Sequence, residues 1–167
     1  MERVAGEKGV SYVVNSYWVY GREHDTCLSF ACKGGHEELV AFLLENGDDP
    51  NEHPGVWPDN WSVLRLAYRS RNLAVVKKLL DAGARVNATK DNYLGRSYPI
   101  FWAVNDGNVK AAQMFIDAGA DVNVKDHHKD STVQRAVGLK HYDMARFLQG
   151  AGAFWVSSTE SVMIYNL

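Results

Sequence analysis

A short run of titratable residues, from Asp126 to Asp130, contains the adjacent histidines His127 and His128. Imidazole titrates near neutrality and carboxylates can orient it, so these residue types could transfer protons or hold a metal ion. Adjacent side chains rarely face one site, so groups from other segments would have to converge on them. Such groups are present at His24, Asp25, His53 and Asp59. Without evidence of convergence, we expect a solvated polar loop and no metal site.

Motifs of known catalytic chemistry are absent from the sequence. There is no Gly-x-x-x-x-Gly-Lys phosphate loop, no Gly-x-Ser-x-Gly nucleophile elbow and no Cys-x-x-Cys pair. The two cysteines, Cys27 and Cys32, lie five residues apart in an expected helix, where the turn of about 100° per residue separates their side chains. Unpaired thiols are typical of a reducing compartment, so we expect a cytoplasmic or nuclear protein without a cofactor.

Aromatic residues form 11% of the chain, include five tryptophans, and gather in segments that the repeat described below places in loops. Tryptophan and tyrosine offer a large contact area with few rotatable bonds, which makes them frequent in binding hot spots. The alternative for each is packing against a neighbouring loop. We expect partner contacts from Tyr17, Trp18, Tyr20, Trp57, Trp61 and Tyr93.

A repeat positions these loops. Three related segments begin at Asn46, Ala82 and Ala118, and their glycines, Gly47, Gly83 and Gly119, are 36 residues apart. Gly152 follows after another 33 residues, and each of these segments follows a helix-like apolar run. A glycine there is typical of a left-handed helix C-cap. The pattern predicts that a helix ends before each glycine.

A second recurring segment predicts where another helix begins. The segments start at Thr26, Ser62, Tyr98 and Ser131, and three of these four residues can cap a helix N-terminus through a side-chain oxygen. Each unit is therefore a helix, a turn, a second helix, a cap and a connecting loop. One such pair cannot bury both of its faces, so neighbouring pairs must stack.

These units resemble the ankyrin repeat, whose hallmark is Thr-Pro-Leu-His-x-Ala, a Gly-His turn, a Val-x-x-Leu-Leu helix and Gly-Ala-Asp-Val-Asn. The resemblance covers Thr26 to about Ala153, and its best pieces are Gly35 to Val40, Gly83 to Ala88 and Gly119 to Asn123. It implies an all-α solenoid of stacked helix-turn-helix units with β-hairpin-like finger loops. The hallmark histidine is replaced throughout, by Ser29, Arg65, Phe101 and Gln134.

We predict one domain over residues 1–167. It comprises a degenerate cap or half-repeat with its finger (1–25), repeats at 26–61, 62–97, 98–130 and 131–153, and a C-terminal cap or the start of a further repeat (154–167). In three of the four fingers the next helix start lies eleven positions after the recurring asparagine, where the family pattern has eight. Insertions in repeat proteins map to loops that often form the binding face.

The resemblance also places the turns between paired helices on the concave, partner-binding face. It adds Lys33, Arg69, Asn105 and Asp106 to the candidate site, together with His127 and His128 on the fourth finger. The formal net charge is −2, so the chain lacks the excess of positive charge that is typical of nucleic-acid-binding proteins. No apolar run is long enough to cross a membrane, so we expect neither a nucleic acid nor a membrane as a partner.

We therefore expect a non-catalytic adaptor or scaffold that binds a protein or peptide. The alternative is a small-molecule-binding or catalytic protein whose pocket combines aromatic fingers with His and Asp residues. A third reading is an inert segment of a longer array. Convergence of three such side chains in one deep cleft would favour the alternative, and an open groove would favour the adaptor.

Overall fold

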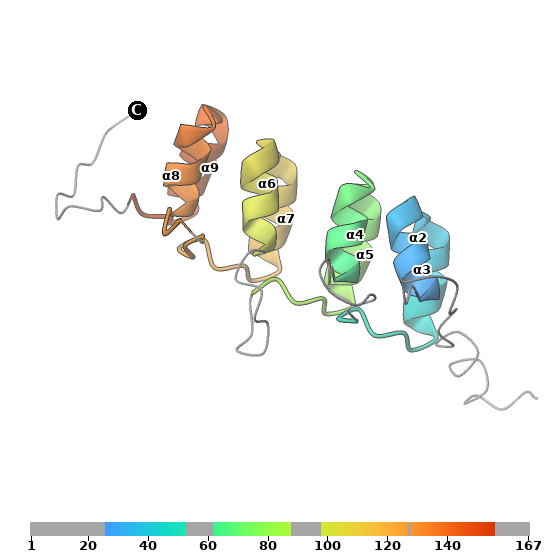
Figure 1. Cartoon of the computed structure of the whole chain (residues 1–167). Helices are drawn as coiled ribbons and strands as arrows, with labels where there is room; N and C mark the ends of the chain where they lie inside the picture. Colours follow the sequence, from blue (N-terminus) through green and yellow to red (C-terminus); the bar gives the residue numbers. More distant parts are fainter. Residues whose placement is uncertain (1–25, 53–61, 88–97, 127, 156–167) are drawn as a thin grey trace, which may run out of the picture. The chain divides into compact units, whose positions relative to one another are not determined.

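The computed structural model describes residues 26–52, 62–87, 98–126 and 128–155, and these residues form eight helices in four pairs (Figure 1). The all-α repeat architecture expected from the sequence is confirmed. The only β feature within the described ranges is an antiparallel bridge between Lys125 and Ser131, on the fourth finger. The helices are α2 (Cys27–Gly34), α3 (Glu37–Glu45), α4 (Val63–Arg69), α5 (Leu73–Asp81), α6 (Pro99–Asp106), α7 (Val109–Asp117), α8 (Thr132–Gly138) and α9 (Tyr142–Gly150).

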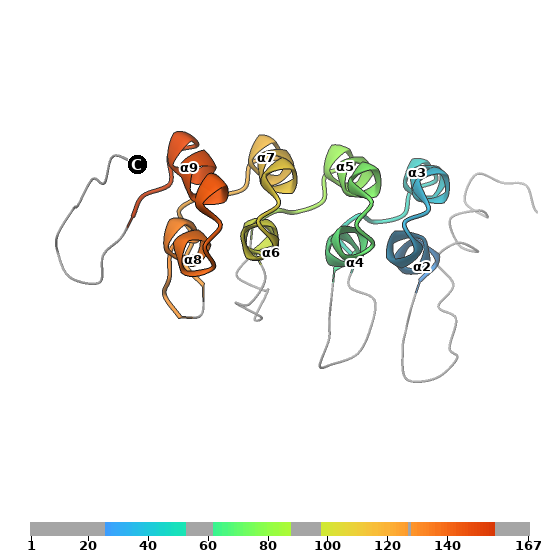
Figure 2. The same ribbon diagram turned by 90° about the horizontal axis from the view of Figure 1, so that it is seen from above.

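The chain divides into two compact units, Met1–Arg85 and Val86–Leu167. In the first unit α2 packs against α4 and α3 against α5, so the two helix pairs stack in register. In the second unit α6 packs against α8 and α7 against α9. Within each unit taken by itself, the first helices of its two repeats form one layer and the second helices form another (Figure 2). Each unit is thus a stack of two repeats.

Three of the four helix starts are capped as the sequence predicts. The side-chain oxygens of Thr26, Ser62 and Ser131 accept hydrogen bonds from the backbone N–H three residues later, which satisfies a donor left unpaired in the first turn. Ser131 and Gln134 form a reciprocal capping box. Tyr98 makes no such bond, and α6 instead begins with Pro99, whose fixed φ suits a first helical turn.

The predicted cap glycines also adopt left-handed backbone. Gly47, Gly83, Gly119 and Gly152 have φ between 88° and 95°. An asparagine of one repeat also forms hydrogen bonds with the backbone at and just after the cap glycine of the following repeat. Asn51, for example, donates from Nδ2 to the carbonyl oxygen of Gly83 (3.2 Å) and accepts from the backbone N–H of Arg85 (2.8 Å).

The same pair of bonds recurs within the second unit. Asn87 bonds to Gly119 and Asp121, and Asn123 bonds to Gly152 and Phe154. The recurring asparagine of the sequence pattern is thus an inter-repeat link. Buried apolar side chains fill the space between the helices. Trp102 is only 8% exposed and meets Phe115 edge to face, with ring centroids 6.1 Å apart.

Candidate partner-binding site

Five of the residues predicted to contact a partner lie in the described part of the chain, and all five are exposed. Lys33 and Arg69 lie at the ends of α2 and α4, Asn105 and Asp106 end α6, and His128 lies on the fourth finger. They therefore lie at or near the C-terminal ends of the first helix of three repeats and on the fourth finger. Tyr17, Trp18, Tyr20, Trp57, Trp61, Tyr93 and His127 fall outside the described residues.

The fourth finger is organised by the carboxylate of Asp126. Its Oδ1 atom accepts hydrogen bonds from the backbone N–H groups of His128 (2.8 Å) and Asp130 (3.0 Å). The backbone N–H of Asp126 donates to the carbonyl oxygen of Asp130 at 3.0 Å and closes the loop. Asp126 therefore acts as a turn-forming residue that fixes where His128 is presented.

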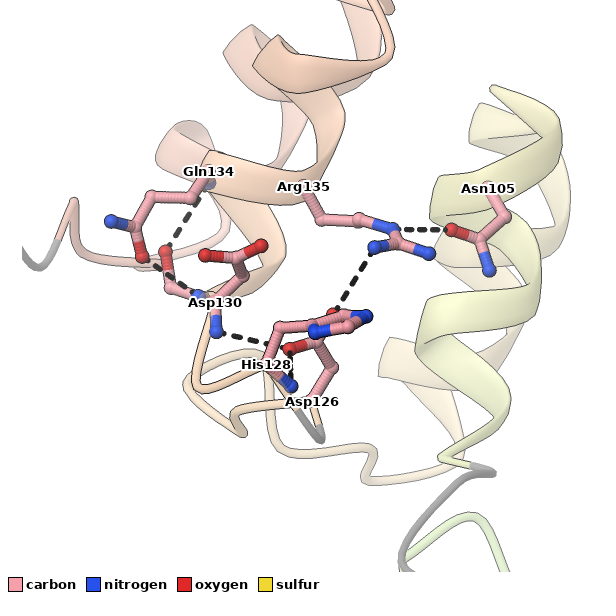
Figure 3. Close-up of polar contacts among 7 residues, drawn as sticks. Asn105, Asp126, His128, Asp130, Gln134 and Arg135 are labelled. Carbon is pink, nitrogen blue, oxygen red and sulfur yellow. Dashed lines mark hydrogen bonds and ion pairs between the residues drawn. The ribbon is translucent and has the colours of Figure 1, made fainter.

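Arg135 on α8 joins this finger to the preceding repeat. Its Nη1 atom lies 3.4 Å from Oδ2 of Asp126, and its Nε atom donates to Oδ1 of Asn105 at 2.9 Å (Figure 3). The side chains of Arg135 and Asp126 are 29% and 8% exposed, so this ion pair is largely shielded from solvent. One guanidinium thus holds a finger and a turn in a fixed relation.

A second contact supports the same turn. The Nε2 atom of His141 lies 3.1 Å from the carbonyl oxygen of Asn105, and the imidazole packs against Gly107. A β-carbon at Gly107 would come within 2.9 Å of His141 Nδ1. Close approach of the two repeats therefore requires glycine at this turn.

The equivalent turns of the first unit are also in direct contact. The Nδ2 atom of Asn72 donates to the carbonyl oxygen of Gly35 at 2.9 Å. A β-carbon at Gly35 would lie 3.2 Å from Oγ of Ser70. The turn after α2 and the turn after α4 are therefore held together as one edge.

Two acidic side chains of the first repeat lie near the N-terminal end of α2 and the C-terminal end of α3, away from this edge. Glu52 accepts a hydrogen bond from the hydroxyl of Thr26, and Asp48 is buried with no hydrogen-bond partner for either carboxylate oxygen among the residues that the structure describes. Burial raises the pKa of both carboxyls, and the charge of Asp48 raises the pKa of Glu52 further while the Thr26 bond lowers it. Burial and the charge of Glu52 raise the pKa of Cys32 to about 12.

Among the described residues, no group of three His, Cys, Asp or Glu side chains is placed to hold a metal ion. His128 is exposed, and the convergence with His24, His53 and Asp59 that a composite site would need lies outside the described ranges. No helix in these ranges is long and apolar enough to cross a membrane.

Two features of the structure were not predicted from the sequence. Arg135 was not predicted, because its role depends on Asn105 being one repeat earlier in space and 30 residues away in sequence. Asp48 was hidden within the repeat pattern, although the aligned residues Ala84, Ala120 and Ala153 could have identified it. A carboxylate in a position that is otherwise alanine is the available signal.

Two protein-family models match the chain. A model of ankyrin repeats in three copies matches residues 5–90, and a single ankyrin-repeat model matches residues 97–127. The chain belongs to the ankyrin-repeat family. Ankyrin repeats are generally protein–protein interaction modules.

Its curated relatives are much longer proteins. An ankyrin repeat and KH domain-containing protein of Caenorhabditis briggsae is 34% identical over 141 residues, which are 84% of this chain and 5% of that protein. An ankyrin repeat protein of Fowlpox virus is 28% identical over 78% of this chain and 17% of its own length. An E3 ubiquitin-protein ligase of Arabidopsis thaliana is 28% identical over 63% of this chain and 6% of the ligase. The chain thus spans only a small part of the relatives it matches.

Proposed function

We propose that this chain is a non-catalytic adaptor or scaffold that binds a protein or peptide on the face formed by its finger loops and inner-helix turns. The observation that most supports this function is the pair of contacts that Arg135 makes with Asn105 and Asp126. Through these contacts Arg135 fixes an exposed turn and an exposed finger relative to each other before any partner arrives. Preorganisation of this kind lowers the entropy cost of binding.

The exposure of the candidate residues supports this function. Asn105, Asp106 and His128 are exposed, and Asn105 contacts Arg135 on α8. Polar residues around a less polar centre are typical of protein interfaces. The aromatic residues Trp18 and Trp57 would supply the less polar part of the surface, and their role as anchors is part of the proposal. The two free cysteines, Cys27 and Cys32, favour a reducing intracellular compartment for this activity.

Site-specific photo-crosslinking tests the proposed face. A photoreactive phenylalanine replaces Asp106 in one variant and Gln113, an exposed residue of the outer helix α7, in the matched control. After irradiation in native lysate, we expect a discrete crosslinked protein with the variant at position 106 and none with the variant at position 113. The same proteins from both variants, or none from the variant at position 106, would contradict the proposal.

A further inference from the structure

We propose that residues 1–25, which precede the described part of the chain, pack against an open face of the first repeat and cap the first unit at that end. In this arrangement Asn15 forms the same link to the first repeat that the later asparagines form to the repeats after them. The open face comprises Phe30, Leu39 and Phe42 and is here named the leading face. This inference does not depend on the proposed partner-binding function.

The leading face is apolar, and no other described residue covers it. Phe30 on α2 is 55% exposed, and Leu39 and Phe42 on α3 are 45% and 51% exposed. Leu39 and Phe42 lie three residues apart, so their side chains share one side of α3. Large apolar side chains gain free energy when they leave water, so this face favours a segment that covers it.

Equivalent positions in later repeats are covered by the repeat before them. Met144 in the last repeat is equivalent to Leu39, and it is only 1% exposed. Both residues have their own paired helix, but Met144 also has a preceding repeat, because α7 packs against α9. Arg135, at the position equivalent to Phe30, reaches back to Asn105 in that preceding repeat. The leading face is therefore the side of the first repeat on which a preceding segment would stack.

An unpartnered pair of backbone groups indicates where this segment would be linked. Asn51 and Asn87 each donate to the carbonyl oxygen 32 residues later and accept from the backbone N–H 34 residues later. The corresponding groups in the first repeat are the carbonyl oxygen of Gly47 and the backbone N–H of Asp49. Within the described residues, neither group has a hydrogen-bond partner. The first repeat thus presents both halves of an asparagine link.

The sequence of the preceding segment matches this link. Asn15 lies 36 residues before Asn51, the interval that also separates the later asparagines of the repeat. It is therefore 32 residues from Gly47 and 34 residues from Asp49, the two intervals of the later links. The family model matches from residue 5, so Asn15 belongs to the matched region. These intervals favour residues 1–25 as the occupant of the leading face.

The link has a consequence for the candidate aromatic residues of the first finger. Tyr17 and Trp18 follow Asn15 directly in the sequence. A segment held at Asn15 starts the first finger at a fixed place beside the first repeat. Trp18 is then offered to a partner from an anchored loop, which lowers the entropy cost of binding.

Amide hydrogen exchange of the whole chain, followed by NMR, tests the link. We expect slow exchange at the Asp49 N–H of the parent, and Asn15→Ala should accelerate it about tenfold, the upper range for one neutral hydrogen bond. Ser16→Ala, which changes the neighbouring polar side chain, is the matched control and should leave this exchange unchanged. Asn51→Ala should accelerate exchange at Arg85 in the same way and calibrates the effect. Slow exchange within α5 confirms that each variant is folded.

A second pair of variants tests whether the leading face is covered. Leu39→Ser and Leu139→Ser each replace a leucine that is exposed to a similar extent among the described residues. If residues 1–25 cover Leu39, the serine there removes a buried apolar contact and lowers the melting temperature by several degrees. We expect this loss for Leu39→Ser and no change for Leu139→Ser.

Each other outcome overturns the inference. Fast exchange at Asp49 in the parent, or equal exchange in Asn15→Ala and Ser16→Ala, would show that Asn15 forms no link. Equal melting temperatures for the two leucine variants would show that the leading face is solvated. A concentration-dependent dimer in analytical ultracentrifugation that Leu39→Ser abolishes would assign this face to a second copy of the chain instead.

Discussion

Asp48 lies at the position in the first repeat that Ala84 occupies in the second, and both residues are buried. The Asp48 carboxylate is buried where the next repeat has a small apolar side chain, and in the described part of the chain neither of its oxygens has a hydrogen-bond partner. A buried polar group without a partner destabilises a fold. An alanine at this position, as in the second repeat, would avoid that cost.

Replacement of Asp48 by alanine should therefore stabilise the chain at neutral pH. We expect the free energy of unfolding to rise by about 1 to 2 kcal/mol, since the substitution removes an unsatisfied buried group and leaves the residue type found at Ala84. Urea unfolding followed by circular dichroism measures the change. Glu45→Ala, which removes an exposed acidic side chain from the same repeat, is the control and should have little effect. A less stable Asp48→Ala variant would show that the carboxylate has a stabilising role.

The same carboxylate should make stability depend on pH. The folded-state pKa values of Asp48 and Glu52 are raised above their ordinary values of 3.8 and 4.5, mainly by burial. Below those ordinary values both carboxyls are protonated in folded and unfolded chains, so they impose no ionisation penalty. As the pH rises through the raised values, the unfolded state loses protons more readily, and stability falls.

The difference in unfolding free energy between Asp48→Ala and the parent should consequently grow from about pH 4 towards neutrality and then level off. Urea titrations at a series of pH values measure it. A difference that stays constant with pH would mean that the Asp48 carboxyl has the same pKa in both states.

Lys140 has a φ of 63° at the turn position that glycine holds in the preceding repeat, as Gly107, with the same φ. Lys140→Gly should raise the unfolding free energy by about 0.5 to 1 kcal/mol, because the steric cost of a left-handed lysine outweighs the extra freedom of glycine in the unfolded chain. Thermal unfolding by calorimetry measures the shift. A lower melting temperature would indicate that the lysine side chain makes a stabilising contact.

Gly107→Ala is the reciprocal substitution and should have the opposite effect. The new β-carbon would lie 2.9 Å from Nδ1 of His141, in addition to the strained φ. We expect a loss of about 2 kcal/mol in calorimetric stability. An unchanged melting temperature would mean that His141 can move aside at little cost.

The two thiols should differ sharply in reactivity. Cys32 is fully buried and its pKa is raised to about 12, whereas Cys27 is only half-buried. Since the thiolate is the reactive form, iodoacetamide at pH 8 should modify Cys27 in the folded chain and Cys32 only after unfolding. Mass spectrometry of tryptic peptides identifies the modified residue. Rapid modification of Cys32 in the folded chain would contradict its buried position.

Much of the fold could be predicted from the sequence because the same pattern of residues recurs in four units. The helix caps depend only on local backbone conformation, so the residue type at each position is enough to predict them. They are the glycines at positions 47, 83, 119 and 152 and the N-caps Thr26, Ser62 and Ser131. The exposed positions of Lys33 and Arg69 followed from the same register. Local preference and repeated spacing were sufficient for these features.

The candidate site was less predictable because its contacts join different repeats. Arg135 acts through Asn105 and Asp126, and nothing in the sequence next to Arg135 shows that those oxygens are near. Arg71 and Lys140 could be identified as departures from the glycine pattern, but their left-handed backbone became evident only in the structure. Residues that depart from a repeat and contact another repeat require three-dimensional information.

The central claim, that the finger and turn bridged by Arg135 form a partner-binding face, is tested most directly by affinity for the protein captured at position 106. Arg135→Ala and Arg146→Ala each remove one arginine charge from the last repeat, but Arg146 is exposed on α9. Isothermal titration calorimetry, after circular dichroism has confirmed folding, compares the two variants with the parent. The account predicts about a tenfold loss of affinity for Arg135→Ala and almost none for Arg146→Ala. Equal affinities for all three proteins would contradict it.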